Sequence, residues 1–170
     1  MVCDTRPVTD KGEDMEKVKN IALVAHDHRK KDLIEWIEWN YKSIIEHKII
    51  CTGTTGTMVE QALKKKLEKE DHDFNIIKLK SGPLGGDQQL GAMIAEGKVD
   101  VIIFLWDPMQ PQPHDVDVKA LLRIAVLYNI PTACNRATAD FLISSSLIGR
   151  EYTPVTKNYE SYIKRDVNLG

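Results

Sequence analysis

Short apolar runs alternate with longer amphipathic segments along this chain, and the alternation limits the folds open to it. The apolar runs are Ile21 to Ala25, Ile49 to Thr52, Phe74 to Leu79, Val99 to Trp106 and Pro131 to Asn135. Their nearly continuous Val, Ile and Leu content is typical of strands that helices bury on both faces. The pattern predicts one α/β domain, built on a doubly wound, mostly parallel, five-stranded sheet with helices on both faces.

The segments between these runs have helical periodicity. The predicted helices cover about Lys30 to His47, Gly56 to Glu70, Gln88 to Glu96, Val116 to Tyr128, Ala137 to Ser145 and Tyr159 to Arg165. In the first of them, Trp36, Ile37, Trp39 and Ile44 have the spacing of a stripe that packs into the core. Residues 1–19 are predicted to form a flexible arm, and residues 20–170 to form the folded domain.

Composition argues against several classes of protein. The 23 Lys and Arg residues balance 25 Asp and Glu residues to a net charge of −2 and gather in no basic stripe, which argues against a nucleic-acid partner. Cys3, Cys51 and Cys134 lie far apart, as expected of free thiols in a reducing cytosol. The first residues lack the apolar centre of a signal peptide, and no run approaches the roughly 20 apolar residues of a membrane span. A cytoplasmic protein with no membrane partner is expected.

The chemically distinctive residues follow the predicted strands. In an open parallel sheet, ligands bind beyond the carboxyl ends of the strands. His26 to Lys30 follow the first strand, Thr52 to Gly56 the second, Ser81 to Gln89 the third, and Trp106 to Pro108 with Pro113 to Asp117 the fourth. We therefore expect these segments to form one site.

The segment Thr52 to Gly56, TGTTG, has the outline of a phosphate cradle. It combines hydroxyl groups with glycines that let backbone N–H groups approach an anion, and a helix is predicted to begin directly after it. A plain strand-to-helix connection would have a similar sequence. Lys30 would add a positive charge, or it is an ordinary surface lysine. Neither GxxxxGK[ST] nor GxGxxG after the first strand is present, which disfavours ATP and dinucleotides.

Several acids and histidines could act on a bound substrate. Asp87 follows a Gly-rich turn and opens a predicted helix, so it is either a helix N-cap or a general base. The helix dipole would lower its pKa and burial would raise it. Asp107 and Asp117 lie near His114 in the sequence. Together with His26 these acids also allow a metal site, although no paired-histidine motif with a third ligand supports one.

Taken together, these segments resemble methylglyoxal synthase. The likeness runs from about Asn20 to Arg165 and is carried by IALVAHDHRK, TGTTG, SGPLGGDQQ, WDP and PHDVD. The resemblance implies a Rossmann-like, methylglyoxal synthase-like domain. It further implies a carbon–oxygen lyase that converts dihydroxyacetone phosphate to methylglyoxal and inorganic phosphate through an enediolate, in the methylglyoxal bypass of glycolysis. According to the resemblance, the reaction uses no metal or organic cofactor. The resemblance also implies a homohexamer that is regulated by inorganic phosphate, which is expected to act as an inhibitor.

The resemblance also implies roles for individual residues. Asp87 matches the catalytic base of the family, and the other active-site acids and histidines match His26, Asp107, His114 and Asp117. The substrate and phosphate positions correspond to His26, Lys30, Thr52, Gly53, Thr54, Thr55, Ser81, Gly82 and His114. In the family, an arginine near the C-terminus reaches into a neighbouring subunit's site and helps to bind phosphate. The nearest candidate in this chain is Arg165, which lies one place out of register with the family pattern.

Two other functions stay open. A regulatory domain of the same fold, such as the allosteric domain of carbamoyl phosphate synthetase, would need the cradle for a phosphorylated ligand but not the carboxylates. An isomerase would stop at the enediolate. The joint presence of Asp87, Asp107, His114 and Asp117, with no attached synthetase in the chain, favours the lyase.

Overall fold

A computed structural model describes residues 14–70, 72–111 and 113–156 of the chain. Within them, one sheet has the strand order β3-β2-β1-β4-β5, and every pairing between neighbouring strands is parallel. The strands are β1 (Asn20–Ala25), β2 (Lys48–Thr52), β3 (Asn75–Leu79), β4 (Val101–Leu105) and β5 (Thr132–Ala133). The predicted α/β fold with a five-stranded sheet is confirmed.

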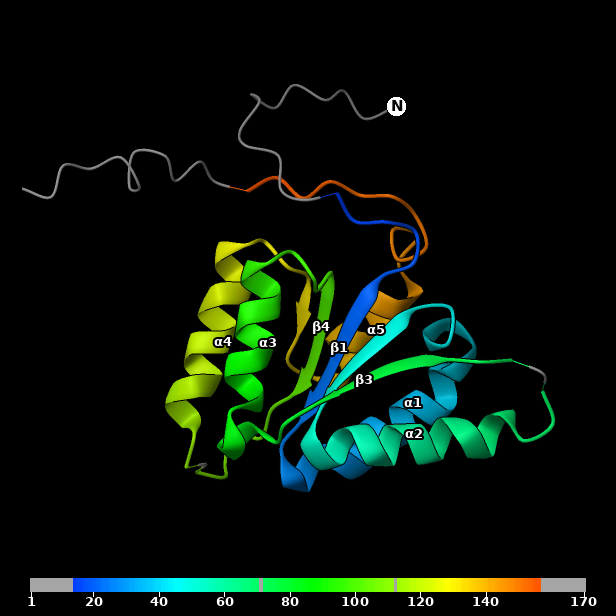
Figure 1. Ribbon diagram of the computed structural model, residues 1–170, viewed down its shortest axis with the longest axis horizontal. Helices are drawn as coiled ribbons and strands as arrows, with labels where there is room; N and C mark the ends of the chain where they lie inside the picture. The colour runs from blue at the N-terminus through cyan, green and yellow to red at the C-terminus, as the bar shows by residue number, and fades with distance from the viewer. Residues whose placement is uncertain (1–13, 71, 112, 157–170) are drawn as a thin grey trace, which may run out of the picture.

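Helices cover both faces of this sheet (Figure 1). One face carries α1 (Lys30–Ile44), α2 (Gly53–Leu67) and α5 (Arg136–Ser144); the other carries α3 (Gly86–Ala95) and α4 (Asp115–Leu127). Two short 3₁₀ helices, η1 (Asp27–Arg29) and η2 (Gly82–Leu84), follow β1 and β3. Successive residues of β1 point to opposite faces, so Ile21 and Leu23 join the core under α1 while Ala22 and Val24 join the core under α3 and α4.

The strand order reverses at β1, which has β2 on one side and β4 on the other. Such a switch point opens a crevice beyond the carboxyl ends of the strands. The register pairs Ala25 with Leu105, the last residues of β1 and β4. The residues that follow these two strands, beginning with His26 and Trp106, therefore leave the sheet side by side.

Some elements differ from the sequence-based expectation. The edge strand β3 is partly exposed, with Ile77 42% accessible, because it has a neighbouring strand on only one side. Trp36 is buried as predicted, but Trp39 is 84% exposed and does not belong to the core stripe. The predicted helix from Tyr159 to Arg165 lies outside the described residues.

The described part of the expected N-terminal arm packs against the domain. Met15 is buried, and its backbone exchanges hydrogen bonds of 2.9 and 3.0 Å with Tyr152. Lys19 is 2% exposed, and its ammonium group donates to the carbonyls of Glu16 and Arg150. Packing therefore begins before residue 20, while residues 1–13 lie outside the described part. None of the helices in the described residues has the length and apolar character that a membrane crossing requires.

Candidate active site

A pocket of about 320 Å³ opens beyond the carboxyl ends of β1, β2 and β4, where the sequence predicts a site. It brings together most of the predicted residues, namely His26, Lys30, Thr52, Gly53, Thr54, Thr55, Ser81, Gly82, Asp87 and His114. Its other described lining residues are Val24, Ala25, Asp27, Pro83 and Phe104. Asp107 and Asp117 are not part of this described lining, although both lie close to residues that are.

The TGTTG segment forms the first turn of α2 itself. The sequence-based start at Gly56 was wrong: the helix begins at Gly53, with Thr52 as its N-cap residue in an extended conformation. The free N–H groups of a helix start and the positive end of its dipole attract anions. Thr52 and Thr55 are buried. This end of the pocket is therefore suited to a phosphate group.

The cradle lies backbone to backbone against the turn after β3. Gly53 has a φ of 39°, and a Cβ there would lie 2.6 Å from the Cα of Ser81. The Gly53 N–H donates a 3.1 Å hydrogen bond to the carbonyl of Lys80. Both the left-handed backbone and the close approach require glycine at this position.

Lys30 supplies a positive charge beside the cradle. Its Nζ lies 2.5 Å from the hydroxyl of Thr54 and 2.5 Å from a carboxylate oxygen of Asp27. The hydrogen bond from Lys30 lowers the pKa of Asp27. Asp27 is a site residue that was not predicted from the sequence, but its spacing of three residues from Lys30 at a helix start is a signal that could have identified the pair.

Asp87 lies inside the first turn of α3, so its interpretation as an N-cap was wrong. The N-cap is Gly85, whose φ of 95° only glycine adopts readily, and Asp87 is the second helical residue. Asp87 is 5% exposed, and its Oδ2 has no hydrogen-bond partner among the described residues. Burial raises the pKa of Asp87, and Asp117 raises it further, against the lowering effect of His114.

His114 faces Asp87 across Gly82. Its Nε2 lies 3.5 Å from Oδ2 of Asp87, and its Nδ1 is buried without a hydrogen-bond partner in the described part of the chain. A Cβ on Gly82 would lie 2.8 Å from the His114 Nε2 and 2.9 Å from the Asp87 Oδ2. Because Gly82 has no side chain, there is space for these two polar atoms to face each other.

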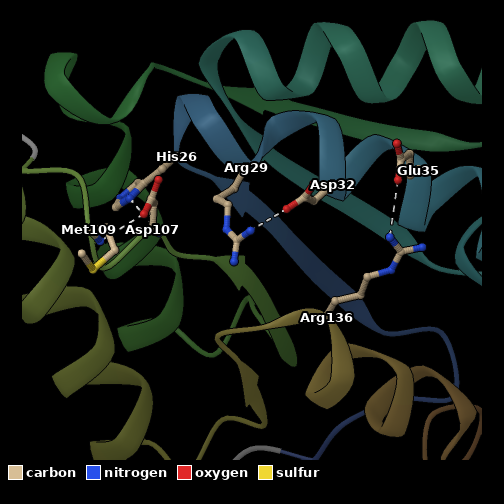
Figure 2. Close-up of polar contacts among 7 residues, drawn as sticks. All are labelled: His26, Arg29, Asp32, Glu35, Asp107, Met109 and Arg136. Carbon is tan, nitrogen blue, oxygen red and sulfur yellow. Dashed lines mark hydrogen bonds and ion pairs between the residues drawn. The ribbon is translucent and has the colours of Figure 1, made fainter.

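His26 is held by the backbone at the β1–β4 switch point. The N–H of Asp107 donates a 3.2 Å hydrogen bond to the His26 Nδ1, as Figure 2 shows. The ring also makes an edge contact with Phe104, at 5.1 Å between ring centroids. Burial lowers the pKa of His26, and the neighbouring His114 lowers it further. A neutral ring whose Nδ1 accepts a hydrogen bond carries its proton on Nε2, which is buried and unpaired within the described residues.

Asp107 and Asp117 act on the pocket from its edge. The Asp107 carboxylate accepts a 3.0 Å hydrogen bond from the N–H of Met109, which stabilises the turn that holds His26 (Figure 2). Asp117 lies in the first turn of α4, and its charge reaches Asp87. The sequence does not single out Phe104, because its position in a buried strand is typical of any core residue.

Comparison with known proteins places the chain among relatives of one kind. The MGS-like domain family matches residues 32–134. The methylglyoxal synthase of Maridesulfovibrio salexigens is 57% identical over 155 residues, which cover 89% of this chain and 99% of the relative. That of Hahella chejuensis is 48% identical and covers 94% of this chain and 98% of its own.

A solved structure agrees with these relatives. The crystal structure of the methylglyoxal synthase from Elizabethkingia anophelis NUHP1 superposes with a TM-score of 0.81 at 44% identity. The alignment covers 93% of this chain and 98% of that one. Fold and sequence therefore agree over nearly the whole length of both chains.

Proposed function

The chain belongs to the methylglyoxal synthase family and has methylglyoxal synthase activity, and we propose that Asp87 is the base that starts its reaction. The observation that carries this proposal is a buried carboxylate with a raised pKa and an unpaired oxygen in the pocket that the cradle also lines. A carboxylate with a raised pKa is a better proton acceptor than an exposed one when it is ionised. The enzyme is a carbon–oxygen lyase.

The substrate in this proposal is dihydroxyacetone phosphate, with its phosphate at the start of α2. Thr52, Thr54 and Thr55 offer hydroxyl donors there, and Lys30 adds a positive charge. The first turn of α2 also offers free N–H groups, although the N–H of Gly53 itself is already bonded to the Lys80 carbonyl. Ser81 and Gly82 complete the cradle from the turn after β3. The three-carbon part of the substrate then extends toward Asp87 and the two histidines, which line the same pocket.

Asp87 removes a proton from the hydroxymethyl carbon next to the ketone, which gives an enediolate. His26 donates from Nε2 and His114 from its ring to the oxygens on which negative charge accumulates. A neutral imidazole suits this role for His26, because the lowered pKa keeps the ring uncharged while it retains one proton to donate. Asp117 and Asp107 support the site, the first through its charge near Asp87 and the second through the turn that holds His26.

Loss of phosphate completes the reaction. The enediolate electrons form a new carbon–carbon double bond as the C–O bond to phosphate breaks. The enol that results tautomerises to methylglyoxal, because its methylene carbon takes up a proton while its hydroxyl group loses one. Elimination is fastest when that C–O bond lies perpendicular to the enediolate plane, so the cradle must hold the phosphate out of this plane. The orientation of the phosphate then separates this lyase from an isomerase.

Product analysis tests the proposal against both other functions. Purified enzyme is incubated with dihydroxyacetone phosphate, and methylglyoxal, inorganic phosphate and aldose phosphate are measured. We expect equal amounts of methylglyoxal and inorganic phosphate. Aldose phosphate alone would identify an isomerase, and no product would identify a sensor of phosphorylated ligands; either result would reject the proposed reaction.

As the pH is lowered, the activity should begin to fall at a higher pH than it would if the base had the pKa of an ordinary aspartate. The base must be ionised, and burial raises the pKa of Asp87 above the usual value of about 3.9. The pH dependence of kcat/KM in the free enzyme reports this group. A midpoint of the acid limb at or below the ordinary aspartate range would contradict the burial of an active carboxylate.

We also propose a cytoplasmic homohexamer in which residues 20–170 form the catalytic domain and inorganic phosphate is an inhibitor. Inhibition would follow from product binding at the cradle. The reaction itself is proposed to need neither metal nor organic cofactor. The role of Arg165 at a neighbouring phosphate site stays a prediction, since this residue lies outside the described part of the chain. Sedimentation velocity is expected to show a hexamer. A monomer as the only species would contradict the proposed assembly.

A further inference from the structure

The proposed function requires a fixed distance between two parts of the site, and the inference below rests on that function. One small substrate must reach both the phosphate cradle at the start of α2 and the Asp87 carboxylate at the start of α3. These two helices lie on opposite faces of the sheet. Some structural link between the two helix starts must therefore set the separation that the substrate spans.

The backbone of Lys80 provides such a link through two hydrogen bonds in series. Its carbonyl accepts a 3.1 Å hydrogen bond from the N–H of Gly53, the first residue of α2. Its N–H donates a 2.8 Å hydrogen bond to Oε1 of Gln89, in the first turn of α3. Gln89 lies two residues after Asp87, so the side chain of Gln89 joins the helix of the base to the backbone that supports the cradle.

Close backbone contacts on both sides transmit any movement of this link to the two helix starts. A Cβ on Gly86 would lie 2.0 Å from the Lys80 carbonyl oxygen, and one on Gly53 would lie 2.6 Å from the Cα of Ser81. The segment from Lys80 to Ser81 is therefore packed between the start of α2 and the start of α3. Gly86 directly precedes Asp87, so a small movement of this segment would move the base.

We propose that Gln89 is a positioning residue, which fixes the base helix at the distance from the phosphate cradle that elimination needs. Gln89 is exposed, so water can replace its hydrogen bond to the Lys80 N–H. A water molecule would satisfy the N–H group without tying it to α3. The consequence of losing Gln89 is thus a shift between base and cradle, and a misplacement of about 1 Å can cost on the order of 10²-fold in rate.

Replacing Gln89 by methionine removes the acceptor while keeping the length of the side chain, and Gln89→Glu keeps an acceptor oxygen at the same place. Gln88→Met is the matched control, because Gln88 directly precedes Gln89, is also exposed and has a side chain with no hydrogen-bond partner among the described residues. We expect Gln89→Met to lower kcat roughly 10-fold. Gln89→Glu and Gln88→Met are expected to stay within about 2-fold of the parent.

The decisive measurement is how the enediolate partitions between elimination of phosphate and return to dihydroxyacetone phosphate. The reaction is run in D₂O, and deuterium in recovered dihydroxyacetone phosphate is divided by the methylglyoxal formed. A loss of folded enzyme lowers both quantities equally and leaves the ratio unchanged. A phosphate that is poorly oriented relative to the base slows elimination but still permits return of a proton, so Gln89→Met should raise the ratio at least about 5-fold.

An unchanged ratio in Gln89→Met would overturn the inference, and so would a ratio in Gln89→Glu as high as that in Gln89→Met. A raised ratio in Gln89→Met alone supports it. A parent enzyme that forms no methylglyoxal would contradict the proposed function and this inference with it. A working parent with the same ratio in every variant contradicts the role of Gln89 alone.

Discussion

Replacing Asp87 by asparagine is expected to lower kcat at least on the order of 10²-fold, because a positioned proton acceptor contributes about 10²- to 10⁴-fold to a rate. The amide of asparagine has nearly the same size and is no base. Substrate binding should change little, since the phosphate contacts lie at the start of α2. Steady-state kinetics with dihydroxyacetone phosphate measures both effects, and full turnover in Asp87→Asn would reject the assigned role.

The same variant should be at least as stable as the parent at neutral pH. A group whose pKa is raised by folding stabilises the fold when it is protonated, and this contribution is lost as the pH rises through the pKa of the folded state. Ionised Asp87 at neutral pH is therefore a cost to the fold, since burial is the main cause of its raised pKa. Thermal unfolding of Asp87→Asn at neutral pH checks this, and it separates a lost base from a lost fold.

Gly82→Ala is expected to lower kcat on the order of 10²-fold while leaving the protein folded. The new methyl group would lie 2.8 Å from Nε2 of His114 and 2.9 Å from Oδ2 of Asp87, so both side chains must move away from their positions. Side chains yield more easily than backbone, and for this reason the loss falls on activity rather than on stability.

Gly149→Ala is a suitable control for that experiment, because a Cβ at Gly149 would meet no described atom within 4 Å. It should retain the activity of the parent. Circular dichroism and thermal unfolding of both variants establish that they fold. A Gly82→Ala enzyme with parental kcat would show that the space between His114 and Asp87 is not needed for the reaction.

The sheet could be predicted from the sequence because its strands carry a strong local signal. In β1 and β4, nearly every side chain is apolar and buried, and the sequence shows this directly as unbroken apolar runs. The exposed edge strand β3 was still found, since its Ile and Leu residues suffice for a strand assignment. Trp39 shows the limit of this reasoning, because helical spacing alone does not tell a core position from an exposed one.

The residues of the site could also be predicted, but their geometry could not. Parallel strands bring their carboxyl ends together, so residues after each apolar run had to meet. The start of α2 was placed three residues late because Gly and Thr are common in turns, whereas here Gly53 and Thr54 form the first helical turn. The hydrogen bond between His26 and Asp107 joins residues 81 positions apart, and no local pattern predicts it.

The His26 ring takes its orientation from a main-chain N–H group, and this has a consequence for mutational scans. Exchanging Asp107 for any amino acid except proline leaves the donor in place, so scanning side chains one at a time would not reveal what selects the proton position on this imidazole. The tautomer is therefore determined by the pairing of the adjacent strands β1 and β4, which places the two residues side by side. Sequences that diverge at residue 107 can keep it, provided that their backbones follow the same path.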